Sequence, residues 1–98
     1  MIIYVDIDET ICKTPEDRDY GKATPIMERI NIINKLYDKG DTIIYWTARG
    51  SGSGQDWLDV TKKQLVSWGV KHHDVKVGKP MYDLFICDKV MNSERFFK

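Results

Sequence analysis

The feature that most constrains the fold is an apolar run without polar alternation at residues 42–47 (TIIYWT). A strand of β-branched and aromatic residues without alternation is typical of a parallel sheet that is covered on both faces. Further apolar runs lie at 2–5 (IIYV) and 84–87 (LFIC), and a shorter one lies at 75–77 (VKV). The sequence therefore predicts a small, mostly parallel sheet of four strands.

Helical patterns separate these strands. Thr24 and Pro25 are typical of a helix N-cap and first turn, and Gly40 is a natural stop for the helix that follows. A second helical pattern covers 55–68, and a short helix is expected at 93–98. Strands that alternate with helices predict an α/β fold of three layers, Rossmann-like in type. The polar segment between the first strand and the first helix is expected to form a flap over the strand end.

Length and composition limit the class of protein. At 98 residues the chain predicts a single domain, 1–98. Lys plus Arg and Asp plus Glu both number 15, and this balance counts against nucleic acid or an anionic membrane as the main partner. No apolar run approaches the roughly 20 residues of a membrane span. Cys12 and Cys87 form neither a metal-binding nor a secreted-type pattern, which predicts a reduced, cytoplasmic protein.

Chemically active residues follow the predicted strands. Asp6 and Asp8 come directly after the first strand, Thr47 ends the second, Lys79 follows the third, and Asp88 follows the fourth. In parallel α/β sheets ligands bind outside the carboxyl ends of the strands. We therefore expect these residues to form one site.

The residue types at these strand ends indicate a reaction. Two neighbouring carboxylates such as Asp6 and Asp8 repel each other, and a bound cation removes that cost. Oxygen ligands with few His or Cys favour Mg²⁺ over zinc. Lys79 and Arg49 beside a metal suit the charged oxygens of a phosphate. The chemistry that fits is phosphoryl transfer, in which positioning and charge neutralisation supply most of the catalysis.

The same segments resemble the four motifs of the haloacid dehalogenase superfamily. DIDET, residues 6–10, is similar to motif I (DxDxT), and IIYWT, residues 43–47, is similar to motif II. Lys79 in GKP resembles motif III, and FICDK, residues 85–89, resembles motif IV. The motifs occur in the family's order over most of the chain. Together with DYGKATP and TARG, they resemble the small capsule-biosynthesis-type phosphatases of that superfamily.

The resemblance implies a role for each matching residue. Asp6 would be the nucleophile that forms an aspartyl-phosphate, and it would also bind Mg²⁺. Asp8 would be the general acid and base, and its backbone carbonyl would be a metal ligand. Asp88 would be the third protein ligand of the metal. Thr47 would hold a phosphoryl oxygen, and Lys79 would neutralise charge.

The resemblance also implies the surroundings of the site. Thr10, Ala48 and Arg49 would contact the substrate, which is expected to be a small phosphorylated metabolite such as a sugar phosphate. The chain has no room for a cap domain, so the fold would be HAD-like with an open site that a neighbouring subunit of a homo-oligomer can close. One departure is Cys87, where many relatives carry an acid.

Two other functions stay open at this point. Capless relatives include 3′-end phosphatases of nucleic acid, although the zero net charge counts against that function. Cys87 and the small size also allow a catalytically weak binding or regulatory module.

Other residues have plainer interpretations. His72 and His73 are expected in an exposed turn with one ring packed on a helix, and Cys87 is expected in the core. The Gly/Ser-rich loop at 50–54 is interpreted as a hinge. Six residues join the third and fourth strands, whereas parallel crossovers usually need a dozen or more.

Overall fold

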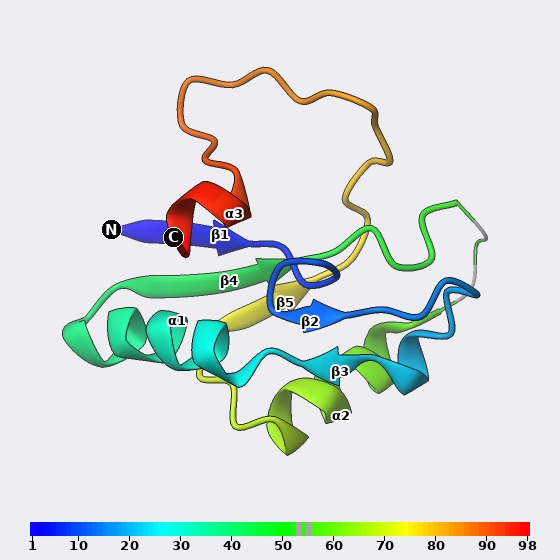
Figure 1. Cartoon of the computed structure of the whole chain (residues 1–98), viewed down its shortest axis with the longest axis horizontal. Helices are drawn as coiled ribbons and strands as arrows, with labels where there is room; N and C mark the ends of the chain where they lie inside the picture. The colour runs from blue at the N-terminus through cyan, green and yellow to red at the C-terminus, as the bar shows by residue number, and fades with distance from the viewer. Residues whose placement is uncertain (53, 55) are drawn as a thin grey trace.

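The fold is built on a three-stranded parallel sheet (Figure 1). The computed structural model describes residues 1–52, 54 and 56–98. Ser53, within the predicted hinge, and Gln55, the predicted start of the second helix, lie outside the described residues. The strands are β1 (Ile2–Val5), β4 (Thr42–Trp46) and β5 (Asp74–Lys76), in the order β1-β4-β5.

The pairing of the strands brings their carboxyl ends to one edge. Val5 pairs with Tyr45, and Trp46 pairs with Lys76, so all three strands end side by side. The chain segments that follow them therefore meet at the same edge. Three of the predicted strands are confirmed, with the third shifted one residue toward the N-terminus.

Two helices cover one face of the sheet. These are α1 (Met27–Lys39) and α2 (Leu58–Ser67). The core lies between them and the strands, where the fully buried side chains include Ile30, Leu65 and Tyr45. Gly40 ends α1 with a φ of 112°, a left-handed conformation that glycine adopts without strain, and the predicted stop is confirmed.

The prediction of three layers, with both faces of the sheet covered, is wrong for the described residues, because one face is left largely open. Ile2 and Tyr4 of β1 are 69% and 51% exposed, and Tyr4 packs edge-on against Trp46 on this face. The short helix α3 (Ser93–Phe96) lies within the predicted terminal helix 93–98 (Figure 1), and Arg29 of α1 donates to its Glu94 at 3.0 Å. No helix among the described residues is long and apolar enough to cross a membrane.

The predicted fourth strand is also wrong. Residues 84–87 have no strand pairing and lie in a long exposed loop between β5 and α3, which arcs away from the sheet (Figure 1). Leu84 is 75% exposed and Ile86 is 88% exposed. Cys87 is exposed as well, so its expected place in the core is wrong. The short link from β5 accounts for this, because it leaves little chain to cross the sheet to the outer edge of β1.

The start of the first helix differs from the prediction. Thr24 and Pro25 form β3, which pairs antiparallel with β2 (Cys12–Lys13). The amide of Ile26 donates to the carbonyl of Ile11 at 2.8 Å, so this backbone belongs to the flap and the helix begins at Met27. Proline lacks an amide donor, so it is tolerated in such a short ladder. The flap also contains η1 (Tyr20–Lys22).

Candidate active site

A tight turn directly after β1 positions the two acids. Ile7 between Asp6 and Asp8 is fully buried, and its carbonyl accepts hydrogen bonds from the amides of Thr10 and Ile11 at 3.1 and 2.9 Å. Glu9 has a φ of 62°, which turns the chain sharply after Asp8. The turn anchors Ile7 in the core and presents both carboxylates at the end of the sheet, as predicted.

Asp6 lies beside a lysine and a hydroxyl. Lys79 Nζ is 3.5 Å from Asp6 Oδ1, and Thr10 Oγ1 is 3.5 Å from Asp6 Oδ2. The carboxylate is 38% exposed, so a ligand can reach it. Burial raises the pKa of Asp6, the charge of Lys79 offsets part of that rise, and the nearby Asp8 adds to it. Asp6 is thus accessible from the open side of the site, and the ammonium group of Lys79 lies beside it.

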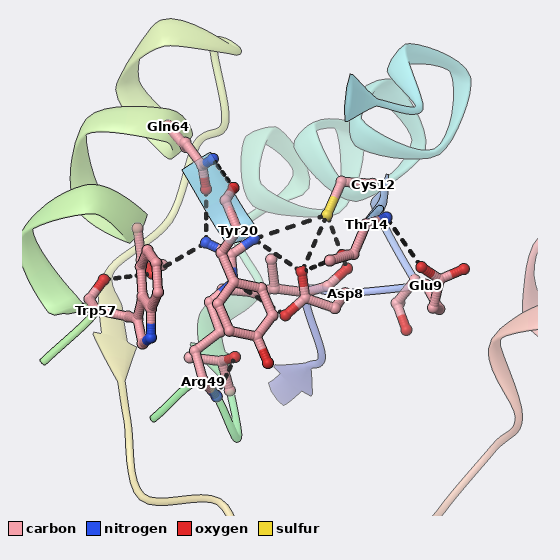
Figure 2. Close-up of polar contacts among 12 residues, drawn as sticks. Asp8, Glu9, Cys12, Thr14, Tyr20, Arg49, Trp57 and Gln64 are labelled. Atoms are coloured by element: carbon pink, nitrogen blue, oxygen red, sulfur yellow. Dashed lines mark hydrogen bonds and ion pairs between the residues drawn. The ribbon is translucent and has the colours of Figure 1, made fainter. Parts of the chain in front are cut away.

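Several hydrogen bonds hold the carboxylate of Asp8 (Figure 2). Arg49 donates from Nη2 to Asp8 Oδ1 at 2.8 Å and from Nε to Asp8 Oδ2 at 2.9 Å. Thr14 Oγ1 donates to Asp8 Oδ1 at 2.6 Å, and Cys12 Sγ lies 3.5 Å from the same oxygen. Burial alone would raise the pKa of Asp8, but the hydrogen bonds from Arg49 and Thr14 and the charge of Arg49 hold it below its ordinary value.

Arg49 is buried behind Asp8. Its side chain has no exposed surface, and its Nη1 donates to Thr61 Oγ1 at 3.1 Å and to the side-chain oxygen of Gln64. The guanidinium lies over the ring of Tyr20, 4.9 Å from the centroid. The structure therefore places Arg49 against Asp8, away from the open side where a substrate phosphate was expected to meet it.

Thr47 and Ala48 form the corner between β4 and Arg49. Thr47 is buried, and its Oγ1 accepts a hydrogen bond from the amide of Arg49 at 3.1 Å. The carbonyl of Thr47 accepts from the amide of Lys79 at 3.2 Å, and Ser51 Oγ donates to the carbonyl of Lys79 at 2.8 Å. Ala48 is half-buried in this corner. The corner thus holds the turn that carries Lys79.

Asp88 does not join the other acids. It lies in the exposed loop after β5, its side chain is 79% exposed, and Lys89 Nζ is 3.1 Å from it. Among the residues that the structure describes, no group of three or more Asp, Glu, His or Cys side chains is arranged to hold a metal ion. The oxygen donors at the end of β1 suit a hard cation such as Mg²⁺ in type, but they supply only part of a ligand set.

A shallow hollow of about 200 Å³ adjoins the site. It lies between the corner after β4, the start of α2 and the turn before Lys79; its lining residues are Arg49, Gly50, Ser51, Asp56, Trp57, Val77 and Gly78. The ring of Tyr20 packs edge-on against Trp57 at 5.1 Å, so the flap closes over one side of this region. A small polar molecule that enters the hollow would lie close to Lys79.

Several partners in this site were missed in the sequence. Thr14, Tyr20, Thr61 and Gln64 were given no role. Thr61 and Gln64 are polar residues three positions apart on the inward side of α2, and that spacing is the one sequence signal that could have indicated them.

The pair His72 and His73 lies away from this site. His73 Nδ1 accepts a hydrogen bond from the amide of Ile43 at 3.1 Å, and its ring packs against Tyr37 of α1 at 4.7 Å. His72 is half-buried, with its Nδ1 3.1 Å from the carbonyl of Val70. The interpretation that one ring packs on a helix is confirmed.

Comparison with known proteins identifies the fold. No family model matches the chain, and no curated protein matches it either. The structure is similar to the crystal structure of an MCSG target from Vibrio cholerae, with a TM-score of 0.84 and 22% sequence identity. The match covers 98% of this chain and 86% of that chain. At this identity the similarity shows the fold alone, which is a small α/β domain with a parallel sheet.

Proposed function

We propose that the chain is a phosphomonoester hydrolase of the haloacid dehalogenase type, with a Rossmann-like fold and no cap domain. The observation that carries the proposal is the pair of Asp6 and Lys79 at the end of β1, 3.5 Å apart, with Asp8 held beside it. An accessible carboxylate next to a cation can attack a phosphoryl group whose charge the cation neutralises. The motif resemblance and the strand-end placement support the same reaction.

The proposed reaction has two steps. A carboxylate oxygen of Asp6 attacks phosphorus, the bond from phosphorus to the ester oxygen breaks, and the leaving oxygen takes a proton to become an alcohol. Water then attacks phosphorus of the aspartyl-phosphate, the bond to Asp6 breaks, and inorganic phosphate leaves. Asp8 would give the proton in the first step and take one from water in the second. Lys79 would neutralise charge in both steps.

Mg²⁺ is the cofactor that we propose for this site. The Asp6 carboxylate and the Asp8 carbonyl would hold it, and when bound it would neutralise charge on the phosphoryl oxygens. Asp88 would complete the ligand set only if residues 84–88 left their exposed position and approached the end of β1.

A small phosphorylated metabolite, for example a sugar phosphate, is the substrate class that we propose. The hollow beside Lys79 measures about 200 Å³, which suits a molecule of that size. Asp56 in its wall can accept hydrogen bonds from hydroxyl groups, and Trp57 offers an apolar surface. The open side leaves space for a neighbouring subunit to complete the wall in a homo-oligomer.

The test is a phosphatase screen with purified protein, with and without Mg²⁺, over sugar phosphates, nucleotides and 3′-phosphorylated oligonucleotides. We expect Mg²⁺-dependent release of phosphate from a small ester, and its loss in Asp6→Asn because the nucleophile is gone. Asp38→Asn is the matched control, since Asp38 is an exposed acid paired with Lys71 outside the site.

Two results would contradict the proposal. Full turnover by Asp6→Asn would exclude Asp6 as the nucleophile. Hydrolysis of no ester, together with no thermal stabilisation by Mg²⁺, would favour a binding or regulatory module instead. Hydrolysis restricted to the oligonucleotides would keep the reaction and change the substrate class.

A further inference from the structure

We infer that Arg49 is a positioning residue that orients the carboxylate of Asp8 and does not bind the phosphoryl group of the substrate. This inference rests on the proposed function, because it assigns a role within that reaction. It differs from the expectation raised by the sequence, in which an arginine next to the strand-end threonine meets phosphate directly. The contacts of the guanidinium distinguish the two roles.

The hydrogen bonds of Arg49 leave it no free donor. A guanidinium carries five N–H groups. Two of them reach the two oxygens of Asp8, at 2.8 and 2.9 Å, and a third points to Cys12 Sγ at 3.9 Å. The two on Nη1 reach the side-chain oxygens of Thr61 and Gln64. A phosphate could bind Arg49 only by breaking one of these bonds in a position that solvent does not reach.

The two bonds to Asp8 fix the plane of its carboxylate. Nε and Nη2 donate in parallel, one to each oxygen, and this fork geometry holds orientation as well as charge. Thr14 Oγ1 adds a third donor at 2.6 Å. Asp8 therefore cannot rotate about its side-chain bonds without losing several hydrogen bonds together. A proton-transferring group benefits from such a fixed position.

Helix α2 and the flap hold Arg49 in turn. Thr61 Oγ1 donates to the carbonyl of Trp57 at 2.7 Å, and the Gln64 amide donates to the carbonyl of Tyr20 (Figure 2). The ring of Tyr20 covers the guanidinium. The position of Asp8 is thus connected through Arg49 to two segments that are distant in the sequence.

The experiment compares the steady-state kinetics of Arg49→Lys with the unaltered chain, on the ester found in the screen. Lysine keeps the positive charge but cannot donate two parallel hydrogen bonds to the two oxygens of Asp8. We expect kcat to fall by about 10- to 100-fold while KM stays within about twofold, because a misplaced proton-transfer group slows chemistry without weakening binding. Arg95→Lys is the matched control, since Arg95 is exposed on α3, and we expect no change in either constant.

A second variant keeps the test decisive if Arg49→Lys fails to fold, as judged by circular dichroism. Gln64→Leu removes one acceptor that holds Arg49 and leaves Asp8 and Arg49 in place. We expect the same pattern on a smaller scale, with kcat lowered by about 3- to 10-fold and KM unchanged.

The possible failures are distinguishable. A KM raised tenfold or more with kcat retained in Arg49→Lys would show that Arg49 binds substrate, and would overturn the inference while the proposed function stands. Unchanged kinetics in whichever variant folds would overturn it too. If the unaltered chain hydrolyses no ester, the proposed function fails, and the role of Arg49 fails with it.

Discussion

Removal of the Asp8 carboxylate should destabilise the fold strongly. Arg49 is fully buried and Asp8 is only 16% exposed, so Asp8→Ala leaves a guanidinium charge without its counter-ion inside the protein. Breaking a buried pair in this way costs about 3–5 kcal/mol. Three of the five Arg49 donors keep acceptors in the variant, on Cys12, Thr61 and Gln64, which favours the lower end of that range.

The expected change is therefore about 3 kcal/mol in the free energy of unfolding. For a domain of this length each kcal/mol shifts Tm by about 4–8 °C, so the variant should melt about 12–24 °C lower. Urea unfolding followed by tryptophan fluorescence measures the free energy directly, because the chain has three tryptophans. Circular dichroism at 222 nm supplies an independent probe of the same transition.

A second ion pair in the chain supplies a matched control. Lys71 Nζ lies 2.8 Å from Asp38 Oδ1, the same distance as in the buried pair, but these side chains are 50% and 54% exposed. Exposed pairs contribute about 0–1 kcal/mol, so Asp38→Ala should change stability little. If Asp8→Ala and Asp38→Ala differ by less than about 1 kcal/mol, the premise that burial decides the strength of the pair is refuted.

The lowered pKa of Asp8 determines how the difference in free energy of unfolding between the unaltered chain and Asp8→Ala depends on pH. A carboxyl whose folded pKa is lower than its unfolded value adds stability above the unfolded value of about 4. That stability is lost as pH falls through the folded value. The unaltered chain and Asp8→Ala should therefore differ most near neutral pH, and their free energies of unfolding should converge in acid.

Two further predictions concern other groups at the site. Asp6→Asn should raise Tm near neutral pH, because burial raises the pKa of Asp6 and its ionised form therefore destabilises the folded state. The gain in Tm should shrink as pH falls through the raised pKa of Asp6. A Tm lower than that of the unaltered chain would contradict this reasoning. Ellman's reagent should modify Cys87 at once and Cys12 only after unfolding, since Cys87 is exposed and burial raises the pKa of Cys12 to about 12. Two thiols that react at once would exclude the buried position of Cys12.

Much of the sheet could be predicted because a strand buried in a parallel sheet has a continuous run of apolar residues in its own sequence. The runs at 2–5 and 42–46 are apolar without alternation, and both are strands in the structure. The run at 84–87 has the same composition and is exposed. Composition reports that a segment favours burial, whereas pairing also requires a link long enough to bring it beside another strand.

The start of α1 shows a second limit of local patterns. Thr24 and Pro25 suit a helix N-terminus, yet they also suit a short edge ladder, because proline needs no amide partner in either place. The choice depends on the pairing of Cys12 with Pro25 across the flap. Thirteen positions separate these two residues, so no short-range pattern contains the information.

Part of the candidate site could be predicted, because the pairing register of the parallel strands alone determines which residues meet at the edge of the sheet. Asp6, Thr47 and Lys79 lie together because parallel strands end at one edge, and each follows or ends a strand that the sequence indicates. The partner of Arg49 was not predictable in this way. An arginine beside two acids and a proposed phosphate site has a carboxylate and a phosphate as equally suitable partners. The acceptors Thr61 and Gln64 on α2 favour the carboxylate here.

The structure places Asp6 and Asp8 in different electrostatic surroundings. Burial raises the pKa of Asp6, while Arg49 and Thr14 overcome burial and lower the pKa of Asp8. Opposite shifts in neighbouring carboxyls are typical of acids with different tasks. Under the proposed function, Asp6 carries a charge that the fold disfavours, and that charge disappears from the carboxylate when its oxygen bonds to phosphorus. Arg49 and Thr14 favour the ionised form of Asp8, which is the state that a base for water requires in the second step. The first step requires the other form, so Asp8 must take up a proton before the ester oxygen leaves.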